Sequence, residues 1–342
     1  MIDFMKKKRN WIGLVVLALI GMGIAAFNLH ERKHEVIPEF VFSYAENQRE
    51  DYPTTLAARR FAELVEERTE GRIRIIVYAE GELGNEMDVI QQLQFGGIDF
   101  ARVSLSHLAE SVPELNVLQM PYLYNDSKHM WKVLDGEIGD AFLHRVQNSE
   151  LIGLSWYDAG SRNFYNSVKP ITSPEDMQGM RIRVQESDVM IDMVEALGAT
   201  ACPISYEEVY SSLEQGLCDG AENNWPSYEA MRHCEVAKYY TVDEHTRVPE
   251  MQICSKHTWQ KLSVEDRKTI LDCAAESALY QRQLWTEREA QSRRVAVQNG
   301  VEEVVLTVEQ KEAFRERMSD VYEKYCSDYM DVIAKILEKG NQ

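Results

Sequence analysis

The stretch "FVFSYAENQREDYPTTLAARRFAELVEERTEGRIRIIVYAEG", from Phe40 to Gly81, decides the fold class of this chain. Residues 39–46 are rich in aromatic and β-branched side chains, as in a short strand. Pro53 suits the first turn of a helix, and apolar residues at helical spacing follow it. Gly71 ends that helix, and "RIRIIVYAEG" alternates as a second strand. This order predicts a parallel sheet covered by helices.

The alternation continues outward from this stretch. "NEMDVIQQLQFGG" predicts the next helix and "IDFARVSL" the next strand, and the C-terminal third is helical, with amphipathic runs at 264–299 and 308–337. A chain of 342 residues suits two lobes, and the absence of a long linker indicates that they exchange strands. We predict an α/β fold in which residues 36–157 and 245–285 form lobe I, and residues 158–244 and 286–342 form lobe II.

The N-terminus has the pattern of an export signal. The basic run Lys6 to Arg9 precedes the apolar stretch from Trp11 to Leu29, with small residues at Ala25 and Ala26. This pattern predicts a secretory signal peptide within residues 1–30, although an uncleaved N-terminal anchor is also possible. Either reading predicts a protein that acts outside the cytoplasmic membrane.

Composition and motifs exclude several functions. The formal net charge of -19 argues against nucleic acid as a partner, because phosphate binding needs a basic surface. The sequence has no GxSxG, no phosphate-binding P-loop, no HExxH and no GxGxxG after a strand. We therefore predict neither an enzyme nor a bound cofactor or metal ion.

The six cysteines show no zinc spacing. In an exported protein they could form disulfides, but a chain of this length does not need them. Cys218 and Cys254 lie in apolar, strand-like runs, which favours buried free thiols.

Three arginines stand out in "SRNFYNSVKPITSPEDMQGMRIRVQES", from Ser161 to Ser187. Arg181 and Arg183 alternate with aliphatic residues, and Arg162 follows a turn after an apolar strand. Either the arginines pair with acids on the surface, or at least one faces inward and binds an anion at the carboxyl end of a strand. The residues alone leave both readings open.

This segment, with "LGATACPISYEEVYSSLEQGLCDGAENN" and "EVAKYYTVDEHT", resembles the DctP-type substrate-binding proteins of tripartite ATP-independent periplasmic (TRAP) transporters. The similarity runs from about Glu39 to the C-terminus. It implies a periplasmic-binding-protein-like fold, in which two α/β lobes are joined by crossing hinge strands and long C-terminal helices. It also implies a cleft that closes over a small organic anion, membrane permease subunits as partners, and a monomer or homodimer in the periplasm.

The resemblance assigns roles to the arginines. It implies that Arg183 grips the ligand carboxylate, that Arg162 assists, and that Asn223 braces the carboxylate or the arginine, whereas Arg181 faces solvent. The chain departs from the family pattern at "CPI", where Cys202 and Ile204 would line or back the pocket, and at "ENNW". There Trp225 could be a core residue or an aromatic platform for a sugar.

The segments "QLQFGGIDFARVS", "AENNWPSYE" and "DEHTRVPE" are most similar to the branch that binds hexuronates such as glucuronate and galacturonate. Glu186 could accept hydrogen bonds from ligand hydroxyls or could cap the following helix, and His245 could be a wall or hinge residue or a structural histidine. The candidate partners for the ligand hydroxyls are Tyr44, Glu46, Arg102, Ser104, Glu186, Asn223, Asn224 and Glu250.

Other functions stay open at this point. A binder of the same fold could take a C4-dicarboxylate, a keto acid or sialic acid, and Arg102 turned inward would favour a ligand with a second negative charge. The protein could also be an extracytoplasmic ligand sensor. A hydrolase is a further alternative, which no motif supports.

Overall fold

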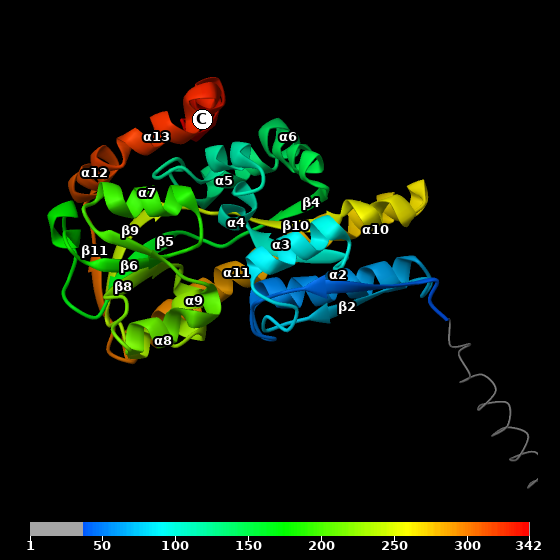
Figure 1. Ribbon diagram of the computed structural model, residues 1–342, viewed down its shortest axis with the longest axis horizontal. Coiled ribbons are helices and arrows are strands. Elements are labelled where there is room, and N and C mark those ends of the chain that lie inside the picture. The colour runs from blue at the N-terminus through cyan, green and yellow to red at the C-terminus, as the bar shows by residue number, and fades with distance from the viewer. Residues whose placement is uncertain (1–36, 342) are drawn as a thin grey trace, which may run out of the picture.

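The computed structural model describes residues 37–341, which form two β-sheets with helices packed around them (Figure 1). The predicted signal peptide or anchor lies outside the described residues. The first sheet has the order β2-β1-β3-β10-β4 and the second has the order β11-β9-β5-β8-β6-β7. The predicted fold class, α/β with two lobes, is confirmed.

The two sheets draw their strands from different parts of the chain. The first sheet contains β1 (Phe40–Ala45), β2 (Ile73–Tyr78), β3 (Phe100–Ser104), β4 (Leu151–Tyr157) and β10 (Glu250–Ser255). The second contains β5 (Arg162–Asn166), β6 (Arg181–Val184), β7 (Thr200–Pro203), β8 (Gly220–Asn223), β9 (Tyr239–Thr246) and β11 (Glu302–Val305).

The helices follow the predicted pattern closely. The first described one, α2, begins at Pro53 and buries an apolar face that includes Phe61 and Leu64. The helices up to the long helix are α2 (Pro53–Arg68), α3 (Glu86–Phe95), α4 (Leu105–Ala109), α5 (Ser127–Leu134), α6 (Glu137–Arg145), α7 (Asp188–Ala196), α8 (Val209–Glu214), α9 (Trp225–Ala230) and α10 (Lys256–Lys261). The long helix and those after it are α11 (Val264–Gln298), α12 (Val308–Arg317), α13 (Ser319–Cys326) and α14 (Met330–Gly340).

The two sheets share one pattern of strand directions, in which two parallel strands lie in the same sheet as one antiparallel strand. In the first sheet, β1 and β3 are parallel, and β10 runs antiparallel to β3 with Glu250 opposite Ser104. In the second sheet, β6 and β8 are parallel, and β5 runs antiparallel to β8 with Asn163 opposite Asn223. In each sheet, therefore, two parallel strands end where an antiparallel strand begins. Ligands of α/β sheets collect at such edges.

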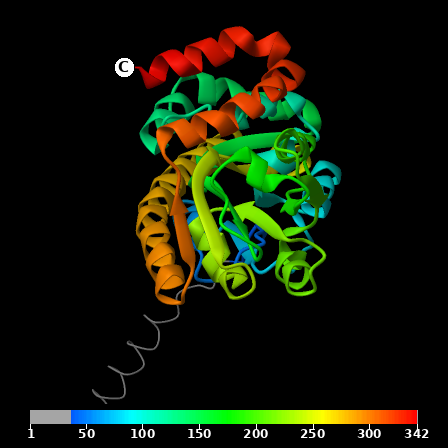
Figure 2. The same ribbon diagram turned by 90° about the vertical axis from the view of Figure 1, so that its left-hand side faces the viewer.

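Three segments connect the two sheets. Residues 158–161 lead from β4 to β5, residues 247–249 lead from β9 to β10, and α10 and α11 lead from β10 to β11. Helix α11 has 35 residues. At about 1.5 Å per residue it is on the order of 50 Å long, and it packs against α2 and α9. Figure 2 shows it running down one side of the molecule. Which residues move together as lobes stays a prediction.

The C-terminal helices differ from the predicted single run at 308–337. The chain forms three helices there, α12, α13 and α14, with breaks at Met318 and at residues 327–329. They lie across one end of the molecule (Figure 2), where α13 packs on both α7 and the short 3₁₀ helix Pro113–Gln119, and α14 packs on α5. This end of the molecule is therefore built from both halves of the chain.

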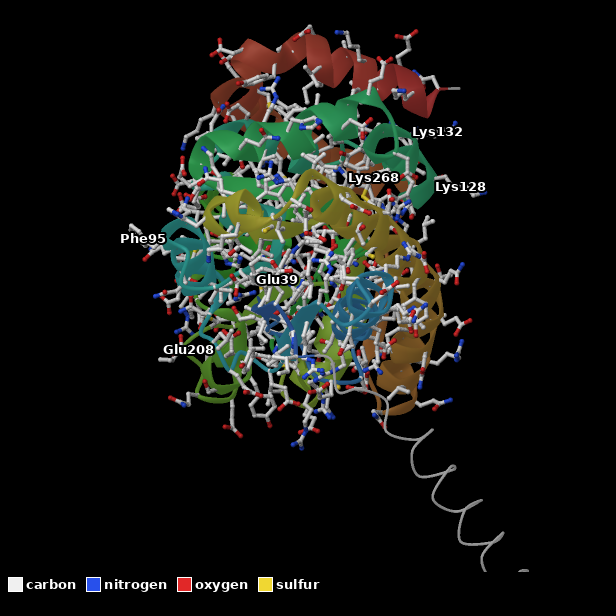
Figure 3. The ribbon with its side chains drawn as sticks, turned by 90° about the vertical axis from the view of Figure 1, so that its right-hand side faces the viewer. Glu39, Phe95, Lys128, Lys132, Glu208 and Lys268 are labelled. Carbon is white, nitrogen blue, oxygen red and sulfur yellow. The ribbon has the colours of Figure 1, made fainter. Side chains whose placement is uncertain are left out.

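The surface carries much of the charge that the composition indicates. Exposed charged side chains include Glu39, Lys132 and Lys268 (Figure 3). No helix within residues 37–341 is long and apolar enough to cross a membrane. All six cysteines are free thiols, and all are buried except Cys202, which is half-buried.

Candidate ligand-binding site

A polar cavity lies where the two sheet edges face each other. Its enclosed volume is about 20 Å³, which is space for little more than one water molecule. A six-carbon sugar acid needs more room, so binding one requires the two edges to move apart from this arrangement. The cavity is lined by Asn47, Gln48, Glu86, Arg102, Ser104, Arg162, Arg183, Gln185, Tyr206, Asn223, Asn224, Ser227 and Glu250.

Arg183 faces this cavity with no acidic partner for its guanidinium among the described residues. It lies on β6, and its side chain is only 1 % exposed. Its Nε donates a hydrogen bond of 2.8 Å to the carbonyl of Ile204, whereas Nη1 and Nη2 are buried and have no partner among the described residues. Burial lowers the pKa of Arg183 from its ordinary value, and the charge of Glu222 opposes that change. Two parallel donors held in this way match the two oxygens of a carboxylate.

Arg162, by contrast, is paired with an internal acid. Its Nε and Nη2 donate to the carboxylate of Glu222 on β8, with an Nη2–Oε1 distance of 2.7 Å. Burial alone would raise the pKa of Glu222, but Arg162 and His245 lower it to about 2. The pair therefore contributes no net charge to the wall of the cavity.

His245 supports this pair from behind. Its Nδ1 lies 2.8 Å from an oxygen of Asp243, its Nε2 lies 3.5 Å from Glu222, and its ring stacks on Phe164. Burial would lower the pKa of His245, but Asp243 and Glu222 raise it to about 9. The residue does not line the cavity, which makes it a structural histidine in this arrangement.

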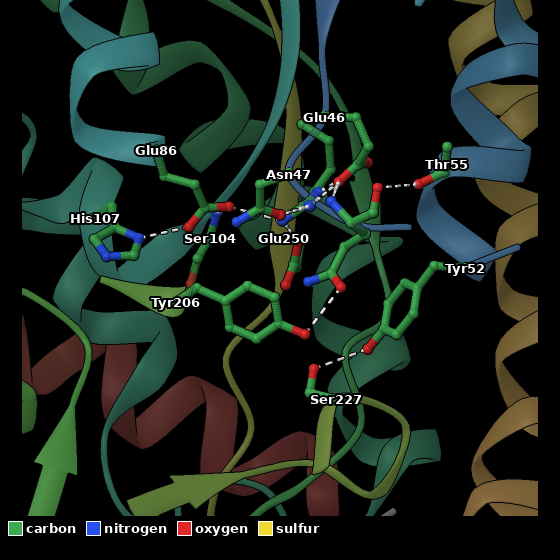
Figure 4. A network of polar contacts seen from close by, with 12 residues as sticks. Glu46, Asn47, Tyr52, Thr55, Glu86, Ser104, His107, Tyr206, Ser227 and Glu250 are labelled. Atoms are coloured by element: carbon green, nitrogen blue, oxygen red, sulfur yellow. Dashed lines mark hydrogen bonds and ion pairs between the residues drawn. The ribbon is translucent and has the colours of Figure 1, made fainter. Parts of the chain in front are cut away.

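On the opposite wall, Arg102 is surrounded by carboxylates. Figure 4 shows these acids, Glu46, Glu86 and Glu250, close together. It lies on β3 and bonds to Glu46, to Glu86 at 2.7 Å and to Glu250 at 2.6 Å. Glu86 also lies 2.6 Å from Nδ1 of His107. Burial raises the pKa of Glu250, while Arg102 opposes the rise. Arg102 is turned inward, as a dicarboxylate site would need, but its donors already have acceptors.

Neutral side chains join the two walls across the cavity. Tyr206 donates to Gln48 at 3.0 Å, and Gln185 donates to Ser104 at 2.9 Å. Near them, the hydroxyls of Tyr52 and Ser227 lie 2.9 Å apart (Figure 4). Each bond links a residue beside the first sheet to one beside the second, so together they hold the walls close. A ligand that separates the walls must replace these bonds with its own hydroxyls.

The structure places seven of the predicted site residues at the cavity. Asn223 is the last residue of β8, and its side chain accepts a hydrogen bond from the backbone N–H of Asn224, which caps α9. The seven lining residues are Arg183, Arg162, Asn223, Asn224, Ser104, Glu250 and Arg102.

The other five predicted residues do not line it. Glu46 lies behind Arg102, and Tyr44 packs with Phe61 in the core of the first sheet. Trp225 stacks on Tyr240, with ring centroids 3.6 Å apart, and is a core residue. Glu186 is half-buried, and the N-cap position of α7 belongs to Ser187. His245 lies behind Glu222, as described above.

Six lining residues were missed from the sequence, and all of them are neutral or acidic. Three lie in loops, and three lie in the first turns of helices. They are Asn47, Gln48 and Gln185 in loops, and Glu86, Tyr206 and Ser227 in helices. Gln185 directly follows "RIRV" and Gln48 follows "FVFSYAE", so the rule that ligands bind beyond strand ends could have found both. Nothing in the local sequence singles out Glu86, Tyr206 or Ser227.

Comparison with known proteins identifies the family. The model of "bacterial extracellular solute-binding protein, family 7", the DctP family, matches residues 44–328. This chain belongs to that family. It is 37% identical over 281 residues to a solute-binding protein of Chromohalobacter salexigens, covering 82% of this chain and 83% of the relative. The family is defined by solute binding and is not a class of enzymes.

Solved structures of TRAP periplasmic solute-binding proteins are similar throughout. One from a Sulfitobacter species, with bound β-D-galacturonate, has a TM-score of 0.83 and 39% identity, covering 88% of this chain and 100% of that one. Another from Roseobacter denitrificans, with bound β-D-glucuronate, has a TM-score of 0.83 and 37% identity, covering 88% and 99%. This solute-binding protein therefore shares its fold with hexuronate-bound relatives.

Proposed function

We propose that this solute-binding protein takes up a hexuronate, glucuronate or galacturonate, outside the cytoplasmic membrane and delivers it to TRAP permease subunits. One observation carries the proposal: Arg183 is buried, its two terminal nitrogens have no partner within residues 37–341, and it faces a cavity whose other lining groups are hydroxyls, amides and already paired charges. A buried cation without a partner is costly, and a ligand carboxylate removes that cost. The hexuronate-bound relatives support the choice of ligand.

The proposed mechanism is binding and closure. In this proposal the carboxylate pairs with Nη1 and Nη2 of Arg183, and the ligand hydroxyls bond to Asn223, Ser104 and Glu250, which line the cavity. Movement of the lobes about the residue 158–161 and 247–249 connections then excludes water, which strengthens the ionic contact. In this proposal the N-terminal segment serves for export, as a cleaved signal or as a tether.

The test is calorimetric titration of the purified protein with matched sugars. Galacturonate and glucuronate are expected to bind, whereas galactose and glucose, which carry CH₂OH in place of the carboxylate, are not. A ligand at a hundredfold over its Kd should add about 2.7 kcal/mol to the free energy of unfolding, which a thermal-shift measurement detects. Equal binding of the neutral sugars, or a preference for succinate over both uronates, would contradict the proposal.

A further inference from the structure

The wall around Arg102 carries more negative than positive charge. Three carboxylates, those of Glu46, Glu86 and Glu250, surround one guanidinium. His107 contacts Glu86 on its far side and, if protonated, offsets only one of the two excess charges. With all three carboxylates ionised, this wall is therefore net negative whichever form His107 takes.

Among these acids, Glu250 is the one placed to meet a ligand. Both oxygens of Glu46 and both of Glu86 accept hydrogen bonds from the protein. Glu250 accepts through Oε2 only, and its Oε1 has no hydrogen-bond donor among the described residues. The Glu250 side chain is also the most exposed of the three, at 14 %, compared with 7 % for Glu86 and 0 % for Glu46. Oε1 of Glu250 is thus an acceptor that faces the cavity.

The opposite wall has the reverse character. Arg183 contributes one positive charge that has no acidic partner within residues 37–341, and the Arg162–Glu222 pair contributes no net charge. The cavity is therefore polarised, with a cationic side on the second sheet and an anionic side on the first. Only a ligand that is negative at one end and bears hydroxyls at the other is complementary to both sides.

We infer that the anionic wall acts as a charge filter, which admits sugar acids with one carboxylate and rejects those with two, and that Glu250 is the residue that decides. The inference rests on the proposed function. A hydroxyl near Glu250 can donate to Oε1, whereas a second carboxylate there would meet like charge in a cavity with little water. The inward position of Arg102 thus does not indicate a dicarboxylate site, because its neighbours reverse the local charge.

The first experiment compares galacturonate with galactarate, in which the carbon far from the first carboxylate is itself a carboxylate. Titration calorimetry of the wild type should show galacturonate binding at least about a hundredfold more tightly, since one like-charge contact in a closed site costs that order of affinity. Glu250→Gln should reduce the ratio of the galactarate Kd to the galacturonate Kd by about tenfold or more. Glu250→Asp, which keeps the charge, should leave this ratio unchanged.

A ratio left unchanged by Glu250→Gln would overturn the filter, because the discrimination would then come from shape alone. The filter would also be overturned if Glu250→Asp lost the preference for galacturonate over galactarate to the same extent as Glu250→Gln. Equal binding of the two acids by the wild type would defeat the filter and leave hexuronate binding intact. Failure of the wild type to bind any uronate would defeat both proposals.

A second measurement needs no variant and so does not depend on whether Glu250→Gln folds. Galactonate and galactarate are both open chains and differ only at the distal carbon, which is CH₂OH in one and a carboxylate in the other. In competition against bound galacturonate, galactonate should be the better competitor by at least about tenfold. Equal competition, or better competition by galactarate, would contradict the filter.

Discussion

Arg183 and Arg102 face the same cavity from opposite sheets, and both side chains are almost fully buried, at 1 % and 2 % exposure. Arg102 bonds to three carboxylates, whereas the terminal nitrogens of Arg183 have no partner among the described residues. The comparison teaches that neither the side chain nor its burial makes an anion site. What distinguishes the two is whether the surrounding residues already supply the negative charge.

The strongest test of this difference is the stability of the ligand-free protein. Arg102→Leu leaves three buried carboxylates without their common cation, so the free energy of unfolding should fall by about 3–5 kcal/mol. Arg183→Leu removes a buried charge that has no carboxylate partner, so it should leave stability unchanged or raise it. Urea denaturation of both variants measures the contrast. Similar losses in the two would mean that Arg183 has a structural partner after all.

Although Arg183→Leu should not reduce stability, it should weaken ligand binding. Replacing Arg183 with leucine removes the proposed carboxylate partner, and the binding free energy of galacturonate should weaken by about 2–5 kcal/mol. Arg183→Lys keeps the charge but loses the planar fork, and its affinity should lie between those of leucine and arginine. Titration calorimetry provides the comparison, with circular dichroism as a check on folding. Wild-type affinity in Arg183→Leu would place the carboxylate site elsewhere.

The pair of Arg162 with Glu222 is supported by His245, and the contribution of this histidine to stability can be measured by its pH dependence. The pKa of His245 is raised from 6.5 to about 9 by Asp243 and Glu222, despite burial. Its stabilising effect is therefore full below pH 6.5 and is lost as the pH rises toward 9. At about 1.4 kcal/mol per pKa unit, the loss of unfolding free energy is at most about 3.5 kcal/mol.

The measurement is urea denaturation at intervals from pH 6 to pH 9. The wild type should lose stability across this range, and His245→Gln should be less stable at pH 6 but should show a flatter dependence. A variant with the same slope as the wild type would show that other groups carry the pH dependence.

The smallest effect is expected at Arg181, which shares β6 with Arg183 but pairs with Asp219 in solvent, at 2.7 Å. Exposed ion pairs contribute about 0–1 kcal/mol, so Arg181→Gln should change stability by no more than that and should leave galacturonate affinity unchanged. It serves as the matched control for the variants of Arg183. A large loss of affinity would show that Arg181 acts on the site through β6.

Much of the fold was predictable because it follows from local patterns. The strand and helix alternation of residues 39–105 became β1, α2, β2, α3 and β3, and the helix predicted at 264–299 is α11. The run at 308–337 was the main error, since it forms three helices instead of one. Periodicity continues through such breaks when the same face stays apolar, so the pattern alone does not reveal where a helix turns.

The site was predictable in part, and for a different reason. The roles of Arg183, Arg162 and Asn223 came from resemblance to the family, and all three line the cavity. Whether they bind the ligand as proposed awaits the experiments above. No local sequence pattern marks Tyr206 or Ser227 as a site residue. Their partners at the cavity, Gln48 and Tyr52, are more than 150 residues away in the sequence.

The order of residues by itself determined the α/β class, the acidic character and the alternation that puts Arg181 and Arg183 on a common strand. It could not determine which arginine would stay unpaired. Arg102 receives Glu46 from 56 residues away and Glu250 from 148 residues away, and Arg162 receives Glu222 from 60 residues away. Electrostatic pairing depends on distance in space, so only the packing of the two sheets decided which buried charge remained for a ligand.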